Sequence, residues 1–294
     1  FDQLIIANTK KFKKMRKEFY ITTPIYYVND KPHIGTAYTT ILADVLSRFK
    51  RDSGHNTFFL TGLDEHGQKV QEAAEHKNVT AQKHCDEMAP RFINLWKRLH
   101  ISNDDFIRTT EKRHKKIVQS ILKRVMDNGD IYEAEYEGLY SVSEERFITE
   151  KEAESGDFRD IKKLKEKNYF FKMSKYQQKL IDHIKSNPKF IQPKHRKNEI
   201  LGFLKNPLND LCISRPKSRL SWGIDLPFDD KYVTYVWFDA LINYITAVGF
   251  EQSDDKFGKW WPASYHLIGK DILTTHAVYW PTMLFSAGIS LPLS

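Results

Sequence analysis

A chain of 294 residues, 40% of them hydrophobic, is long enough to bury the core of two domains, or of one domain with a large insertion. It has no run of about 18 apolar residues, which excludes a membrane-spanning helix. Its two cysteines, Cys85 and Cys212, lie too far apart to suggest a disulfide framework or a cysteine-rich zinc site. The net charge of +8 suits a polyanionic partner, but basic proteins without one are common.

Basic residues gather in two parts of the chain. One cluster is Lys10–Lys17, ahead of the first predicted strand, and the other runs from Lys162 to Lys205. Charge runs are usually solvated faces or flexible arms. We therefore expect a basic N-terminal arm over residues 1–17, with the remnant of an organelle-targeting segment as the alternative. Few cysteines fit a reducing compartment, so the cytoplasm is expected, and an organelle matrix is the alternative.

The first half of the chain has the pattern of a parallel α/β sheet. Residues 18–23 are rich in aromatic and β-branched types and predict a strand. Apolar residues then recur at helical spacing from Ala37 to Phe49, and a short apolar run from Asn56 to Gly62 predicts a second strand. Residues 86–128 suggest two helices separated by a polar break at Ser102–Asp105.

The composition changes in the middle of the chain, which indicates an inserted module. Apolar strand patterns return at Tyr232–Phe238 and Tyr265–Ile268, and a helical pattern covers Ile272–Ala287. The predicted fold is a doubly wound, Rossmann-like α/β domain split by an α+β insertion. The expected divisions are the arm at 1–17, a first half at 18–130, the insertion at 131–215 and a second half at 216–294.

The first segment with chemical meaning is Pro32–Tyr38, between the first strand and its helix. Gly35 at this junction lets the backbone approach a phosphate, and the start of a helix offers free N–H groups to an anion. His33 beside it can donate hydrogen bonds to phosphate oxygens as charge develops in a transition state. Alone this signal is weak, because a single histidine near a turn is usually structural.

Three further segments place polar residues at the carboxyl ends of predicted strands. They are Thr61–Gly67, Tyr235–Leu241 and His266–Ile272, with His276 one turn later. In an open α/β sheet, ligands bind at the carboxyl edge of the strands. Four such segments in this order predict that all four converge on one ligand crevice.

Together these segments resemble the methionyl-tRNA synthetase family of bacterial and organellar type. The resemblance runs from about residue 18 to the last residue, and I-Y-Y-V-N, W-F-D-A and I-G-K-D are its most specific segments. It implies a class I synthetase that uses ATP to activate L-methionine as methionyl-adenylate and transfers it to the 3′ end of methionine tRNA. It also implies that residues 131–215 are the connective-peptide insertion, and that the anticodon-binding domain is absent from this chain. Mg²⁺ would arrive with ATP, held mainly by the phosphates.

The resemblance assigns an ATP site. His33, Gly35 and Thr36 fall in the class I signature that contacts the phosphates and carries the catalysis. Thr36 stands where that signature usually has histidine, which removes one hydrogen-bond donor. The adenosine side of the site is matched by Gly269, Asp271 and Ile272, where Asp271 would accept hydrogen bonds from the ribose hydroxyls.

The resemblance also assigns a methionine site. Asp64 matches the carboxylate that receives the ammonium group, and a helix N-cap is a compatible second reading. Aromatic and aliphatic walls suit a polarizable thioether. Without the resemblance, most of these aromatic residues would be interpreted as core. The matched walls are Ile25, Tyr27, Trp237, Ala240, Leu241, Tyr244, Ile272 and His276.

Two features point elsewhere. Lys172-Met173-Ser174-Lys175 is similar to the second class I signature, but it lies inside the insertion and Tyr176 follows where the family has serine. We interpret it as a coincidence, and expect the true loop to be absent. Many relatives hold zinc in the insertion through cysteines. The corresponding stretch, Tyr140–Arg146, has none, so neither a structural zinc nor another metal site is expected.

Two alternatives stay open. One is a class I synthetase for leucine, valine or cysteine, although Trp237 and Tyr27 argue against a branched aliphatic substrate. The other is a non-catalytic module that binds tRNA or a partner protein, against which Asp64, Gly269 and Asp271 argue. No membrane partner is expected, and the oligomeric state does not follow from the sequence.

Overall fold

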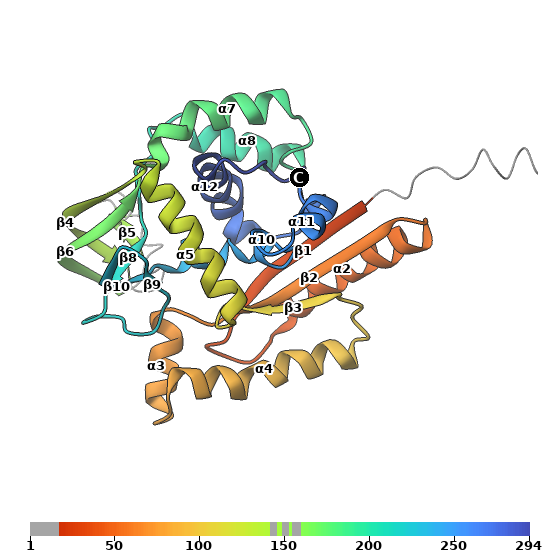
Figure 1. Ribbon diagram of the computed structural model, residues 1–294, viewed down its shortest axis with the longest axis horizontal. Coiled ribbons are helices and arrows are strands. Elements are labelled where there is room, and N and C mark those ends of the chain that lie inside the picture. The colour runs from red at the N-terminus through yellow and green to blue at the C-terminus, as the bar shows by residue number, and fades with distance from the viewer. Residues whose placement is uncertain (1–17, 142–145, 149–152, 155–159) are drawn as a thin grey trace, which may run out of the picture.

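The computed structural model describes residues 18–141, 146–148, 153–154 and 160–294. A four-stranded parallel sheet in the order β11-β1-β2-β3 forms its centre (Figure 1). Within the part of the chain that the structure describes, no helix is both long and apolar enough to cross a membrane. The strands of this sheet are β1 (Glu18–Tyr27), β2 (Asn56–Asp64), β3 (Asp105–Arg108) and β11 (Tyr265–His266).

Helices cover both faces of this sheet, as expected for a doubly wound fold. Successive side chains of a strand point to opposite faces. Tyr20 and Leu60 therefore join the large core with α5 and α12, while Ile21 and Phe59 pack against α2 on the other face. The helices of this body are α2 (Ile34–Asp52), α3 (Gln68–His76), α4 (Ala81–Arg98), α5 (Lys112–Asp127), α9 (Val236–Ala240), α10 (Asn243–Thr246), α11 (Asp254–Trp260) and α12 (Trp280–Ala287).

Strand β1 continues beyond the predicted end at residue 23. Its register against β2 shifts between Thr22 and Ile25, and Pro24 lies in this irregularity, where a residue without an N–H group is tolerated. Beyond the shift, Tyr27 pairs with Asp64. The extension therefore brings the last residues of two neighbouring strands side by side.

The prediction of two helices with a polar break was incomplete, because the short strand β3 lies between them. A Cβ at Gly62 would come within 2.1 Å of the carbonyl oxygen of Ile107, so glycine allows the close approach of β2 and β3. A strand of four residues after a polar stretch gives too short a pattern to be predicted.

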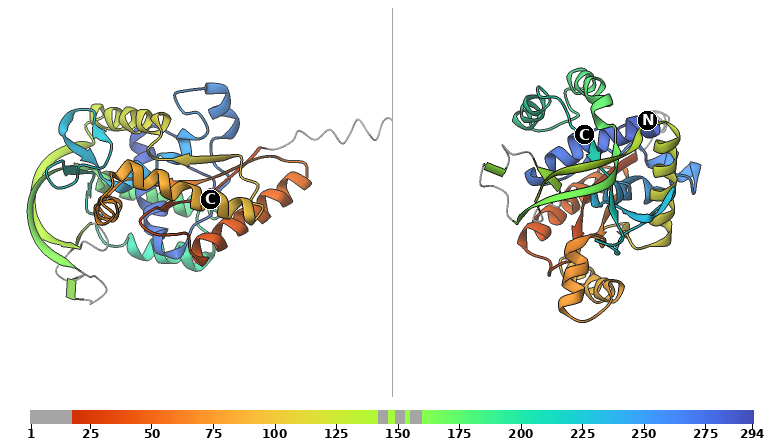
Figure 2. Two further views of the ribbon diagram at one scale, coloured as in Figure 1. Left: turned by 90° about the horizontal axis from the view of Figure 1, so that it is seen from below. Right: turned by 90° about the vertical axis from the view of Figure 1, so that its left-hand side faces the viewer.

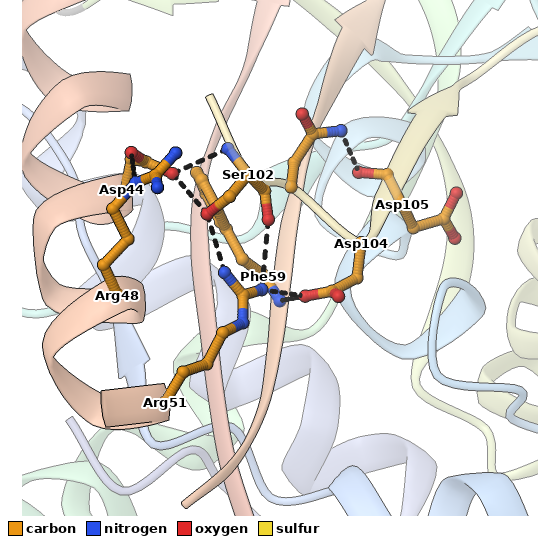
Figure 3. Close-up of polar contacts among 8 residues, drawn as sticks. Asp44, Arg48, Arg51, Phe59, Ser102, Asp104 and Asp105 are labelled. Atoms are coloured by element: carbon orange, nitrogen blue, oxygen red, sulfur yellow. Dashed lines mark hydrogen bonds and ion pairs between the residues drawn. The ribbon is translucent and has the colours of Figure 1, made fainter. Parts of the chain in front are cut away.

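The polar residues before β3 attach it to α2 and β2 (Figure 3). Asp44 of α2 accepts from the backbone N–H of Ser102 at 2.7 Å, and Arg51 donates to Asp104 at 2.6 Å. Asp104 in turn accepts from the N–H of Phe59 at 2.7 Å. The helix that begins at the His-Ile-Gly segment is thus fixed to the sheet near its far end.

The middle of the chain forms a separate antiparallel sheet in the order β5-β4-β6-β7. Its long hairpin of β4 and β6 curves away from the parallel sheet (Figure 2). Lysines of β6 pair across the hairpin with glutamates of β4, as in Lys167–Glu133 at 2.7 Å and Lys163–Glu137 at 3.2 Å. The elements here are β4 (Ile131–Ser141), β5 (Arg146–Ile148), β6 (Ile161–Phe171), η1 (Met173–Tyr176), α7 (Gln177–Ser186), α8 (Lys194–Phe203) and β7 (Leu211–Cys212).

One predicted strand of the parallel sheet was wrong. The apolar run Tyr232–Phe238 contains β10 (Asp229–Thr234), which pairs antiparallel with β8 (Ser214–Pro216) and β9 (Asp225–Leu226). The Tyr235 N–H bonds to the carbonyl of Ile213 in register with β8, and the run then continues as helix α9. The second half contributes β11 to the parallel sheet instead.

Candidate functional site

The start of α2 is capped by its own histidine. The Nδ1 of His33 accepts the N–H of Gly35 at 3.1 Å, so in the neutral ring the proton lies on Nε2. A Cβ at Gly35 would come within 3.0 Å of the His33 ring, which makes glycine the residue that fits beneath it. His33 is exposed, whereas Thr36 is buried. An exposed N–H donor therefore lies beside a helix N-terminus.

The ends of β1 and β2 meet the third segment at Gly67. This glycine has φ +109°, and a Cβ on it would lie 2.2 Å from the Oη of Tyr27 and 3.0 Å from Val236. Asp64, 4% exposed, pairs with Tyr27 in the sheet. The absence of a side chain at Gly67 thus lets two of the four segments come together with the end of β1.

Tyr244 and His276 join the second-half segments. The His276 Nδ1–H donates to the carbonyl of Ile272 at 3.0 Å, so its Nε2 accepts from the Tyr244 hydroxyl at 2.7 Å. Burial lowers the pKa of His276 to about 4, although the Ile272 carbonyl and the charge of Asp271 oppose this. Burial raises the pKa of Tyr244, and the charge of Asp64 adds to the increase. A neutral histidine is therefore hydrogen-bonded to a protonated tyrosine, and the tyrosine lies within electrostatic reach of Asp64.

His276 lies in a π-helical turn, η3 (Thr275–Tyr279), which interrupts the helix predicted over Ile272–Ala287. Such turns are frequent at functional sites. The remaining predicted wall residues differ in burial. Ala240, Leu241 and Tyr244 are buried, and Ile25, Tyr27, Trp237 and Ile272 are half-buried.

The I-G-K-D segment follows β11, which lies next to β1 in the sheet. Gly269 precedes the 3₁₀ turn η2 (Lys270–Ile272), and a Cβ on it would come within 2.5 Å of the Asp271 carboxylate. Glycine therefore lets the exposed Asp271 side chain fold back over the turn. The turn therefore presents an accessible hydrogen-bond acceptor.

A buried triad was not predicted from the sequence. The Asp239 carboxylate accepts from His66 Nδ1 at 2.6 Å and from His114 Nε2 at 2.7 Å. Burial raises the pKa of Asp239, but the charge and hydrogen bonds of the two histidines outweigh it and bring the value to about 2. Both His66 and Asp239 lie in segments that the sequence singled out. Nothing local indicates that residues so far apart are hydrogen-bonded.

The Lys-Met-Ser-Lys segment contacts the base of the insertion. Lys175 pairs with Asp130 at 2.6 Å, Lys172 donates to the carbonyl of Gly129 at 2.8 Å, and the Ser174 hydroxyl donates to Asp210 at 2.6 Å. These contacts agree with the interpretation that its similarity to a phosphate-binding signature is coincidental.

Metal ligands do not gather in the described residues. Among them, no three His, Cys, Asp or Glu side chains are grouped as a metal site would require. Cys85 and Cys212 are free thiols. Part of the stretch Tyr140–Arg146, on which the zinc expectation rests, lies outside the described residues.

The sheet, the capped helix after β1 and the carboxylate that ends β2 are typical of the nucleotide-binding domain of class I aminoacyl-tRNA synthetases. The family model "tRNA synthetases class I (M)" matches residues 19–157 and 153–294. The chain is 53% identical over 285 residues to a methionine–tRNA ligase of Fusobacterium nucleatum, covering 95% of this chain and 44% of that protein. It is 51% identical over 282 residues to the enzyme of Rickettsia bellii, covering 95% and 55%.

A solved structure agrees. Mycobacterium tuberculosis methionyl-tRNA synthetase in complex with methionyl-adenylate superposes with a TM-score of 0.90 at 42% identity, covering 94% of this chain and 56% of that chain. The chain therefore belongs to the methionyl-tRNA synthetase family, and both the predicted family and the predicted fold class are confirmed. It spans about half the length of the curated relatives it matches.

Proposed function

We propose that the protein is a methionine–tRNA ligase, which activates L-methionine with ATP and transfers it to methionine tRNA. One observation carries this proposal. In a fold whose solved relative holds methionyl-adenylate, Asp64, Tyr27 and the capped start of α2 lie at the carboxyl ends of neighbouring parallel strands. This is the edge at which α/β sheets bind ligands.

The amino acid would bind between the end of β2 and the second-half helices. Asp64 receives the ammonium group, since a nearly buried carboxylate gains most from a cationic partner. The thioether lies against aromatic and aliphatic walls. The neutral His276 and the Tyr244 hydroxyl give the pocket a polar end without a net charge. The proposed walls are Ile25, Tyr27, Trp237, Ala240, Leu241, Tyr244, Ile272 and His276.

ATP would bind along the start of α2 and the turn after β11. His33 and Gly35 contact the phosphates, with Thr36 in the same helix turn, and Mg²⁺ accompanies the triphosphate. Gly269 and Ile272 line the adenosine, and Asp271 accepts from its ribose hydroxyls.

In the first reaction, a carboxylate oxygen of methionine forms a bond to the α-phosphorus of ATP. The bond from that phosphorus to the bridging oxygen breaks, and pyrophosphate leaves with the electron pair. A terminal ribose hydroxyl of tRNA then attacks the carbonyl carbon, loses its proton and releases AMP. No side chain acts as nucleophile, so catalysis consists of alignment of the two substrates and stabilisation of charge on the phosphates.

The proposed organisation follows the same divisions as the sequence: the arm at 1–17, the split nucleotide-binding domain at 18–130 and 216–294, and the connective-peptide insertion at 131–215. Residues 1–17 lie outside the described residues. Transfer RNA is the proposed macromolecular partner, and the cytoplasm the proposed compartment, with an organelle matrix as the alternative.

Methionine-dependent exchange of pyrophosphate into ATP tests the proposal. We expect exchange with methionine and little with leucine, valine or cysteine. Exchange with one of those three instead would support a different class I synthetase. No exchange with any amino acid, in a folded protein that still binds tRNA, would support a non-catalytic module.

A further inference from the structure

The side chain of Asp239 points away from the proposed methionine pocket, although its neighbours in sequence line it. Asp239 lies on α9 between Trp237 and Ala240. Residues two apart on a helix lie on roughly opposite sides, since each residue turns the helix by about 100°. Trp237 is half-buried and Asp239 fully buried, in agreement with such a division. The rotation of α9 therefore decides how the tryptophan faces the pocket.

Helix α9 has little of its own to fix that rotation. It has only five residues, and no side chain caps its start at Tyr235. Helices this short depend on tertiary contacts for their stability. Apolar contacts are non-directional and permit small rotations, whereas hydrogen bonds to a charged group are short and directional. The two bonds of Asp239 are of this second kind.

The first partner of Asp239 lies in the loop that follows the proposed ammonium-binding carboxylate. His66 follows Asp64 by two residues, in the loop between β2 and α3, and its ring packs against Trp222 at 5.3 Å. Trp222 also donates to the carbonyl of Glu65, whose carboxylate receives Arg108 at 2.7 Å. This loop is therefore also held by contacts that do not involve α9.

The second partner lies on a longer element. His114 belongs to α5, which packs in the large core, and its side chain is fully buried. Asp239 is thus hydrogen-bonded both to the loop that follows the proposed ammonium-binding Asp64 and to a core helix.

We propose that Asp239 is a positioning residue for methionine selection. Through His66 and His114 it fixes the distance and rotation of the Trp237 wall relative to Asp64. It does not touch the substrate. The inference rests on the proposed function, because it assumes that Asp64 and Trp237 bind the two ends of methionine.

The first test is Asp239→Asn in the full natural chain, assayed by pyrophosphate exchange. The amide has nearly the same shape, but its NH2 group faces one of the two histidine donors. Small misplacements of binding groups can cost about a hundredfold. We expect the KM for methionine to rise about tenfold or more and discrimination against leucine to fall, while the KM for ATP stays within about threefold.

Asp130→Asn is the matched control. Asp130 is also fully buried and accepts from Lys175, Tyr176 and Ser286 at the base of the insertion. We expect it to lower the melting temperature without changing the KM for methionine. Equal changes of KM in both variants would overturn the proposal, because they would reflect general loosening. So would a destabilised Asp239→Asn whose methionine KM stays within about twofold of the wild type.

A pair of variants at His114 decides the matter if Asp239→Asn does not fold. In His114→Gln the amide N–H takes the place of Nε2–H, whereas His114→Met is of similar size and has no donor. We expect the glutamine variant to keep the wild-type KM for methionine and the methionine variant to raise it. The same KM in both would overturn the proposal. If the wild type itself shows no exchange, the proposed function fails instead.

Discussion

Asp239 in the crevice and Asp130 at the base of the insertion are both fully buried carboxylates, each held by donors from distant parts of the chain. In both, burial raises the pKa and the donors more than compensate, so both remain ionised at neutral pH. Their surroundings differ. The donors to Asp239 are two buried histidines, whereas Asp130 is paired with Lys175, which is half exposed.

The comparison shows that burial and a shifted pKa do not by themselves mark a functional residue. Replacement of either carboxylate would leave its buried donors without an acceptor, and should destabilise the protein in both regions. The two regions differ in the groups that would shift if the buried carboxylate lost its hydrogen bonds. The groups near Asp239 are proposed to bind substrate. The groups near Asp130 join the insertion to α12 through Ser286.

The largest effect is expected from His33→Ala. Loss of one donor to the reacting phosphates should lower the rate of adenylate formation about a hundredfold or more, with the affinity for methionine nearly unchanged. Single-turnover measurement of adenylate formation checks this. The loss of the cap should cost only about 1 kcal/mol of stability. A variant with the wild-type rate would remove the phosphate site from the start of α2.

Gly67→Ala should weaken methionine binding about tenfold to a hundredfold. The new Cβ would lie 2.2 Å from the Tyr27 hydroxyl, and overpacking of this kind costs about 1–3 kcal/mol. Gly202→Ala in α8 is the control, since a Cβ there meets nothing within 4 Å and alanine favours a helix. Calorimetric titration with methionine compares the two. Unchanged affinity for methionine in Gly67→Ala would contradict the close packing of Tyr27 and Val236 against this residue in the methionine pocket.

The pH dependence of stability should carry the signature of the buried His276. Its folded pKa is about 4, below the ordinary value of 6.5, so between these values the unfolded chain binds a proton that the folded chain does not. Stability should therefore fall as pH decreases from 6.5 to 4, by up to about 1.4 kcal/mol per pH unit from this group. Urea unfolding at several pH values measures the slope. His276→Gln should reduce it, and an unchanged slope would argue against a neutral, buried His276.

The smallest effect is expected from Lys175→Ala. An ion pair with a half-exposed lysine contributes less than about 1 kcal/mol, and adenylate formation should stay within about twofold of the wild type. Pyrophosphate exchange and thermal unfolding check the two expectations. A loss comparable to that of His33→Ala would mean that the Lys-Met-Ser-Lys segment contacts the triphosphate after all.

Local patterns predicted the parts of the fold that are long and regular. The unit of β1, α2 and β2 follows from apolar spacing, and the strand at Tyr265 was found the same way. The short strand β3 and the five-residue α9 were missed, because so few residues give no recognisable period. The run Tyr232–Phe238 has the composition of a strand, but composition does not specify the sheet to which a strand belongs.

The sequence predicted which segments form the candidate site. It did not predict the side-chain contacts between those segments. That strand ends converge follows from the rules of α/β sheets. The pairing of His66 with Asp239, and of Tyr244 with His276, depends on long-range packing that a single sequence does not reveal. The proposed positioning role of Asp239 therefore rests on contacts in the structure, and the family resemblance alone does not predict it.

The most direct test of the account is methionine binding measured by calorimetry, in the wild type and in Asp64→Asn, with leucine as the competing ligand. We expect saturable binding of methionine, no competition by leucine, and loss of binding in the variant while its unfolding transition remains cooperative. Binding that survives in Asp64→Asn, or that leucine displaces as well as methionine does, would contradict the assignment of this crevice as the methionine site.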